Sequence, residues 1–282
     1  MKVVFTKLDL NAEAIARYET LLKKIKRPFV MEISNYTTKI IAKGYNLHFV
    51  KSEHGNRVFS AYAKIKADLK DKPLPVLDME RNCYYDTSFK GDAFYSDRVY
   101  NIDIKCAYCT ILLNAGYITQ KTFDYINKLP KEERLAALGM LASRKDIFHH
   151  NARGYVVKME ERISPLSNFF YYCVQKTEDI IQSCKNQILM DSFLFSWVNG
   201  IYYLNDNANY QKITQDHLKK DFNLESSFKL LTDFEVKLKN DFYKISFNEP
   251  DNPDPKKFNI PLPESYLKKR IIHHLLTKNY RP

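Results

Sequence analysis

The stretch VYNIDIKCAYCTILL, residues 99–113, places one carboxylate, Asp103, inside an otherwise apolar run. The first part of the stretch is rich in β-branched and aromatic residues, which predicts a buried β-strand. A carboxylate in such a strand is costly unless it is paired, neutralised or bound to a metal. Lys105 has the same strand parity and is one candidate partner. A divalent cation such as Mg²⁺, which prefers carboxylate oxygens, is the other.

The segments on either side of this stretch predict an α+β fold. Helical periodicity covers residues 11–28, 119–148, 164–190 and 214–222, and β-rich runs cover residues 28–52, 152–163, 193–206 and 234–247. Asn199-Gly200 separates two aromatic-rich runs and is typical of a β-hairpin turn. We therefore expect an antiparallel sheet with helices packed on one face.

Proline and charge distribution predict three regions along the chain. Residues 1–75 form a small N-terminal α+β subregion, and residues 76–250 form the core with inserted helices. Residues 251–282 are expected to be a Pro-rich linker followed by a basic C-terminal helix.

Composition points to a polyanionic partner. The 282 residues include 44 Lys and Arg against 33 Asp and Glu, a net charge of +11. The 20 Tyr and 18 Phe add aromatic faces on which unpaired bases can stack. With 7 Gly and neither G-x-G-x-x-G nor G-x-x-x-x-G-K-[ST], the sequence excludes the common Gly-rich phosphate loops.

Cellular location is also predicted from composition. No apolar stretch approaches the roughly 18 residues that a membrane span requires. The five Cys are irregularly spaced, which favours reduced cytosolic thiols. We expect a cytoplasmic protein of a bacterial or phage-infected cell, because a small chain rich in Lys, Tyr and Asn suits a phage or mobile element.

The segment DIKCAYCTILL, residues 103–113, resembles motif A of family B DNA polymerases. Asp103 and Tyr108 match the pattern D-x-x-S-x-Y-P-S, as do the apolar residues that follow, whereas Cys106 and Cys109 stand where Ser and Pro are usual. The resemblance implies that Asp103 holds the catalytic metal, Mg²⁺ or Mn²⁺. It also implies that Tyr108 lies under the sugar of an incoming dNTP.

The segment FLFSWVNGIYY, residues 193–203, resembles the motif C hairpin of polymerase palm domains. In such palms an acid at the turn completes a two-metal site, but here the turn position is Asn199. The nearest acids, Asp191 and Asp206, stand about 17 Å along a strand from the turn. The resemblance implies a palm-like sheet with Asp103 and Asn199 at its centre, and either a weakened metal site or an inactive one.

Basic residues supply the remaining candidates. Residues 133–148 resemble the motif B helix more distantly, and its nucleotide-binding candidates are Arg134, Arg144 and Lys145. An ordinary solvated helix face explains them equally well. The candidates for nucleic-acid contact are Lys237, Lys239, Tyr243, Lys244, Lys268, Lys269 and Arg270. A strand edge protected by lysines is the alternative for those of residues 237–244.

Three functions fit these patterns. The first is a minimal DNA-directed polymerase or nucleotidyltransferase that acts in DNA replication on primer-template or single-stranded DNA with dNTPs, together with further protein subunits of a replication complex. The second is a metal-dependent nuclease, in which Asp103 and Lys105 form a D-x-K half-motif and Asp86, Asp92 or Asp97 supplies the second acid. The third is a non-catalytic nucleic-acid-binding replication protein.

Overall fold

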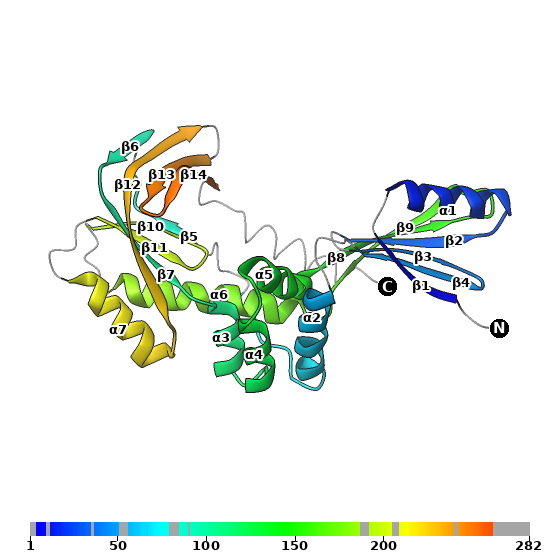
Figure 1. Ribbon diagram of the computed structural model, residues 1–282, viewed down its shortest axis with the longest axis horizontal. Helices are drawn as coiled ribbons and strands as arrows, with labels where there is room; N and C mark the ends of the chain where they lie inside the picture. Colours follow the sequence, from blue (N-terminus) through cyan, green and yellow to red (C-terminus); the bar gives the residue numbers. More distant parts are fainter. Residues whose placement is uncertain are drawn as a thin grey trace. The chain divides into compact units, whose positions relative to one another are not determined.

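The computed structural model describes residues 4–9, 12–34, 37–50, 56–78, 85–89, 91–186, 192–204, 209–239 and 242–261. The predicted basic C-terminal helix, with Lys268, Lys269 and Arg270, lies outside these ranges. The chain divides into two compact units. Within the described ranges, the first unit contains residues 4–74 and 124–170, and the second contains residues 75–123 and 171–261 (Figure 1).

The first unit is built on a mixed sheet with the strand order β1-β4-β3-β2-β8-β9. The pair β1–β4 is parallel, and the other neighbouring strands are antiparallel. Its strands are β1 (Val4–Asp9), β2 (Phe29–Ile33), β3 (Thr37–Ala42), β4 (Tyr45–Val50), β8 (Arg144–His150) and β9 (Val156–Ile163). Helix α1 (Ala12–Lys24) lies on the sheet, and Leu22, Phe29, Ile40 and Phe49 are part of the apolar core between them. Helices α2 (Asn56–Leu69) and α5 (Lys131–Gly139) pack together beside it.

The boundary near residue 75 coincides with the edge of the first unit, but the expected core of residues 76–250 does not form one unit. Residues 124–170 return to the N-terminal sheet because β8 pairs with β2, with Ile147 opposite Glu32. The helix expected through residue 148 is also wrong. It ends with α5 and a 3₁₀ turn, Met140–Ala142, and β8 then begins at Arg144.

The second unit is built on the sheet β14-β13-β12-β7-β11-β10-β5, with β6 paired to β12. The strands are β5 (Tyr85–Thr87), β6 (Ala93–Ser96), β7 (Val99–Ile104), β10 (Phe193–Trp197), β11 (Gly200–Tyr203), β12 (Ser226–Lys239), β13 (Phe242–Glu249) and β14 (Asn252–Pro261). The helices are α3 (Ala107–Asn114), α7 (Tyr210–Phe222), and α4 (Gln120–Asn127) and α6 (Ser167–Lys185), which both cross the unit boundary in sequence.

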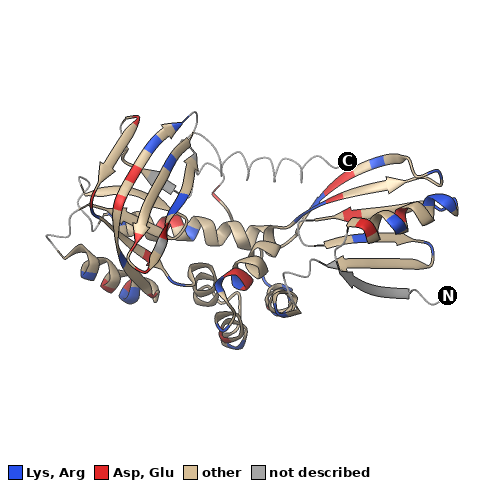
Figure 2. Cartoon of the chain, turned by 45° about the horizontal axis from the view of Figure 1, so that its top comes forward, with Lys and Arg blue, Asp and Glu red and all other residues tan. Residues whose placement is uncertain are grey.

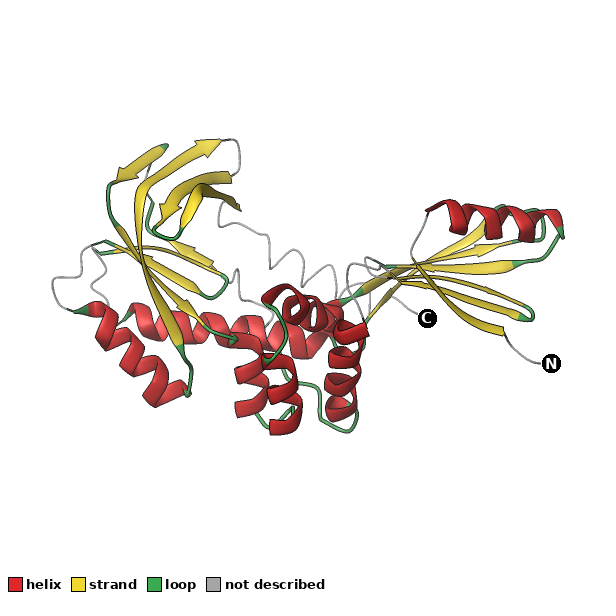
Figure 3. Cartoon of the chain, viewed as in Figure 1, coloured by secondary structure: helices red, strands yellow, loops and turns green. Residues whose placement is uncertain are grey.

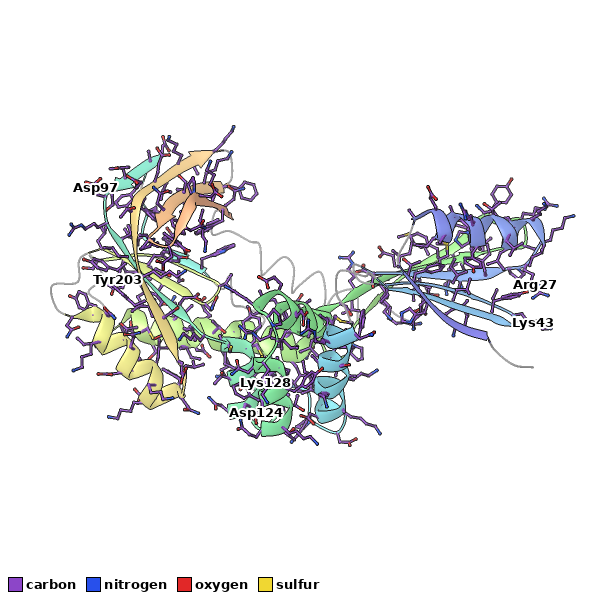
Figure 4. All side chains as sticks on the ribbon, viewed as in Figure 1. Arg27, Lys43, Asp97, Asp124, Lys128 and Tyr203 are labelled. Carbon is purple, nitrogen blue, oxygen red and sulfur yellow. The ribbon has the colours of Figure 1, made fainter. Side chains whose placement is uncertain are left out.

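Four strands of this sheet form a βαββαβ arrangement. In chain order they are β7, β10, β11 and β12, with α6 before the hairpin and α7 after it, and their spatial order is β12-β7-β11-β10. The helices lie on one face of the sheet, as Figures 1 and 3 show. Ile102 and Ile104 of β7 are fully buried, and Tyr203, labelled in Figure 4, makes an edge contact with Tyr210 at the start of α7. The predicted α+β class, with helices on one face of an antiparallel sheet, is confirmed.

Strand β12 makes the sheet curl. It pairs with β7 up to Leu231 and with β13 and β6 beyond it, and the register shifts between Thr232 and Glu235. Asp233 has a left-handed φ of 50° within this bulge, which bends the strand. The concave side is filled by an aromatic core that includes Phe195, Phe234 and Phe247. Residues 252–261, expected to be a linker, form β14 instead and close this core.

Candidate functional site

Asp103 lies near the end of β7 between two small neighbours. Gly200 of β11 stands opposite it on one side and Ser227 of β12 on the other. A Cβ atom on Gly200 would lie 3.1 Å from the Tyr202 ring and 3.3 Å from Asn101 Nδ2, so a side chain here requires its neighbours to move. Directly after the strand, Cys106 has a left-handed φ of 50° and turns the chain into α3. Asp103 thus stands near the end of a strand that leads into a helix.

The β10–β11 hairpin brings Asn199 beside the end of β7. Its two-residue turn is Val198-Asn199, one residue earlier than the predicted Asn199-Gly200, because Trp197 pairs with Gly200. The backbone of Val198 has a φ of 57°, a conformation that costs a β-branched residue roughly 1–3 kcal/mol. The turn that carries Asn199 is therefore strained.

The side chain of Asn199 is tied to the backbone of β7. Its Nδ2 donates a hydrogen bond to the Ile104 carbonyl oxygen at 2.6 Å, and the Ile104 amide donates to the Asn199 carbonyl oxygen at 2.9 Å. The hairpin and β7 are thus joined by two reciprocal bonds next to Asp103. An aspartate at this position has no N–H with which to make the first of them.

A charged network lies on the same sheet face as Asp103. Tyr202 stands opposite Asn101, one row along β7 from Asp103. Burial, and then the negative charges of Asp103 and Glu249, raise the pKa of Tyr202 well above its usual value. The phenol of Tyr202 is therefore neutral at pH 7.

Glu249 is held by two lysines. Lys229 Nζ lies 2.9 Å from one carboxylate oxygen and Lys256 Nζ lies 2.8 Å from the other. Burial would raise the pKa of Glu249, but the hydrogen bonds from Lys256 and Lys229 outweigh it, so the pKa of this carboxyl lies below its usual value. Both carboxylate oxygens of Glu249 are therefore held by lysine ammonium groups.

Aromatic rings cover the sheet beside this network. The Tyr202 ring stacks on Phe195 with centroids 4.0 Å apart, and Trp197, in the same row as Gly200, stacks on Phe258 of β14 at 6.1 Å. Phe258 also lies 6.4 Å from Tyr202. Phe258 of β14 thus covers part of the sheet face that carries Asp103.

A two-metal centre does not fit the described residues. They contain no group of three or more His, Cys, Asp or Glu side chains placed to hold a metal ion. Asn199 directs its amide nitrogen at a carbonyl, and the oxygens of Glu249 are bound by lysines. Asp103 alone offers one carboxylate to Mg²⁺, which usually needs one or two together with substrate phosphates. Asp191 and Asp206 lie outside the described residues.

The predicted nucleotide-binding residues fall into different units. Tyr108 lies in the first turn of α3 in the second unit, and its carbonyl accepts a bond from Cys173 Sγ at 3.7 Å. Arg134 belongs to the first unit, where its Nη1 donates to the carbonyls that end α4, those of residues 127 and 129. Its guanidinium is therefore engaged as a helix C-cap.

The other two basic candidates of the expected motif B helix are strand residues. Arg144 forms an ion pair with Glu161 across the β8–β9 pair, and Lys145 Nζ lies 3.7 Å from Glu32. Both belong to the first unit, whereas Asp103 belongs to the second. Both side chains are therefore engaged in ion pairs within the sheet of the first unit.

The acids predicted for a nuclease are far from Asp103 within the second unit. Asp97, labelled in Figure 4, accepts a bond from the Tyr95 hydroxyl at 2.8 Å and precedes the start of β7; six strand residues span about 20 Å. Asp86 lies on β5, three strand spacings or about 14 Å from β7. Asp92 is exposed beside β12, where its carbonyl accepts the amide of residue 238. None is placed to share a metal with Asp103.

The lysines predicted to contact nucleic acid lie together, but the predicted aromatic residue does not join them. Lys237 of β12 stands opposite Lys244 of β13, and Lys239 stands opposite Phe242, so these four side chains share one face. Tyr243 points to the other face, is 7% exposed, and packs against other core rings. Strand alternation across the hairpin is the signal that identifies Phe242 rather than Tyr243.

No protein-family model matches the chain, and no curated protein is similar enough to be matched to it. The likeness to polymerase palms thus rests on the residues of β7 and the hairpin and on the order of the strands. No helix in the described part of the chain is long and apolar enough to cross a lipid bilayer.

Proposed function

We propose that this protein is a nucleic-acid-binding relative of the palm polymerases in which the nucleotidyl-transfer centre has been reduced to one carboxylate. The observation that carries the proposal is the pairing of β7 with the β10–β11 hairpin, which sets Asp103 opposite Gly200 and beside the turn residue Asn199. The strand order β12-β7-β11-β10, with helices on the opposite face, supports palm ancestry.

The chemistry of the site favours binding over catalysis. In-line nucleotidyl transfer needs charge at both the attacking and the leaving oxygens, which two metals supply. Here Asn199, which stands where a second acid would be needed, donates a hydrogen bond to the Ile104 carbonyl. The charge of the nearby Glu249 is neutralised by Lys229 and Lys256. The protein's net charge of +11 favours contacts with the phosphates of a nucleic acid.

The test measures binding and chemistry on the same samples. The chain, Asp103→Ala and Asn199→Asp are titrated into fluorescein-labelled single-stranded DNA and a primer-template, and each is incubated with four dNTPs and Mg²⁺ or Mn²⁺. We expect all three proteins to bind, with similar affinity, and the unaltered chain to leave the primer unextended. Absence of binding to either DNA at low salt would refute the proposal.

Polymerase activity is the second candidate, favoured by Asp103 at the strand end and Tyr108 one helical turn beyond it. Extension by the unaltered chain that disappears in Asp103→Ala would establish it and overturn the non-catalytic assignment. Strand cleavage that disappears in the same variant would instead establish the nuclease.

A further inference from the structure

The convex face of the curled sheet in the second unit gathers lysines at one end. Pairing sets Lys237 opposite Lys244 and Lys239 opposite Phe242, and Lys257 of β14 follows one row away across Ser246. All four lysines are exposed, with 62% of the Lys237 side chain accessible. Blue segments mark lysines along the strands of this sheet in Figure 2.

Lys237 and Lys244 form a like-charge pair directly across two strands, an arrangement that destabilises a sheet by itself. Lys237 is offset by Glu235, whose carboxylate lies 2.6 Å from its Nζ. The described residues place no acid within ion-pair distance of Lys239, Lys244 or Lys257, so within this part of the chain the three ammonium groups have no carboxylate partner.

An exposed aromatic ring stands within this group. Phe242 occupies an outward-facing position of the alternating strand β13, and 44% of it is exposed. Adjacent strands are about 4.8 Å apart, so the Lys237, Lys239 and Lys244 stems all begin within roughly 5–8 Å of the ring. An aromatic ring with ammonium groups around it can stack on an unpaired base, while the lysines hold the phosphates on either side of that base.

Three acidic residues lie near the other end of this face. Tyr95 of β6 pairs with Glu235 and donates its hydroxyl to Asp97. This hydrogen bond to Asp97, and then the negative charges of Asp97 and Asp233, raise the pKa of Tyr95. Among the described residues, this face therefore carries carboxylates near the β12 bulge and lysines toward the paired ends of β12 and β13. Such a separation of charge orients a polyanion toward the lysines.

We propose that Phe242 with Lys237, Lys239, Lys244 and Lys257 forms a binding platform for single-stranded nucleic acid. This inference rests on the proposed function, and it places the contact on the convex face rather than on the face that carries Asp103. A single strand is the partner because a base must be unpaired to stack on the ring, whereas a duplex would offer only its phosphates to this face.

The first variant pair tests the charges. Lys239→Glu/Lys244→Glu reverses two lysines that form no ion pair with a described acid, and Lys219→Glu/Lys220→Glu makes the same change in net charge on exposed residues of α7 in the same unit. Binding to fluorescein-labelled oligo(dT) is followed by anisotropy across salt concentrations. We expect the first variant to lose about tenfold in affinity and about 1.4 in the logarithmic salt slope, and the α7 variant to lose much less.

The second variant pair tests the ring. Phe242→Leu keeps an apolar side chain but removes the aromatic face, and Phe242→Trp keeps it. We expect about a tenfold loss of affinity for the single strand in Phe242→Leu, with duplex binding unchanged, and retention in Phe242→Trp. If the charge-reversed variant does not fold, Lys239→Gln/Lys244→Gln replaces it, with thermal melting as the check.

The outcomes separate the two proposals. Equal losses in the β-sheet and α7 variants, with the unaltered chain binding DNA, would overturn the platform and leave nucleic-acid binding in place. An unchanged affinity in Phe242→Leu would do the same. Failure of the unaltered chain to bind either DNA would overturn both proposals together.

Discussion

The bond from Asn199 Nδ2 to the Ile104 carbonyl predicts how the protein responds to an acid at the hairpin turn. The N···O distance is 2.6 Å, and Ile104 is fully buried. Removing the amide in Asn199→Ala costs the net hydrogen bond and part of the desolvation of the carbonyl, about 1–2 kcal/mol. Asn199→Asp replaces a donor by a carboxylate that faces a carbonyl oxygen, which raises the expected cost at pH 7 to about 2–3 kcal/mol.

The pH dependence distinguishes the two variants. A carboxylate beside a carbonyl has its pKa raised in the folded state, so Asn199→Asp regains a donor, and stability, as the pH falls through that pKa. Asn199→Ala has no group to protonate and shows no such recovery. Asn114→Asp is the matched control, because Asn114 Nδ2 also donates to a carbonyl, that of Phe222 at 2.8 Å, but in an exposed position where water can replace it.

The assay is urea unfolding followed by fluorescence. The chain has one tryptophan, Trp197, which lies in β10 immediately before the turn and so reports on the second unit. A loss of 2–3 kcal/mol lowers the midpoint by about 1 M for a slope of roughly 2–3 kcal/mol/M. The reasoning is refuted if Asn199→Asp is as stable as the unaltered chain at pH 7. Stabilisation of that variant by Mg²⁺, absent from Asn199→Ala, would show that position 199 faces a cation beside Asp103.

Three further predictions concern the same unit. Burial would raise the pKa of Glu249, but hydrogen bonds from two lysines hold it below its usual value. The stabilisation by this carboxylate is therefore present above the unfolded-state pKa and is lost as the pH falls through the lower folded-state pKa. Glu249→Gln should be less stable than the unaltered chain at pH 7, and acid unfolding curves should show the difference closing below about pH 4. Phe195 is fully buried and stacks on Tyr202, so Phe195→Ala should cost about 3–5 kcal/mol by the same urea assay. Burial raises the pKa of Cys184 to about 12, so at pH 8 iodoacetamide should modify the half-buried Cys106 before Cys184, as read by peptide mass spectrometry; the reverse order would mean that α6 opens readily.

Local patterns were sufficient for the elements around Asp103. The apolar run of residues 99–104 forms β7, the long periodic segment forms α6, and the two aromatic runs around Asn199 form a hairpin. These elements follow from periodicity and turn chemistry, which act over a few residues. The α+β class could therefore be predicted from the sequence.

The partners of the predicted site residues could not be read in the same way. Arg134 caps α4 and Arg144 pairs across two strands, although both lie in a segment that reads as one helix. Residues 144–150 are a strand because they pair on one side with β9, which follows directly, and on the other with β2, more than a hundred residues earlier in the chain. Pairing over such a distance has no local signature, and it outweighs a helical preference of a few tenths of a kcal/mol per residue.

The sequence by itself determined that Asp103 ends a buried strand and that Asn199 occupies a hairpin turn. Only the tertiary structure decided that the Asn199 amide binds the β7 backbone and that Lys229 and Lys256 occupy the carboxylate of Glu249. The physical reason is that each of these contacts joins different strands or their turns, and therefore depends on the register in which the strands pair. A shift of one residue in that register would send the side chains of a strand to the opposite face.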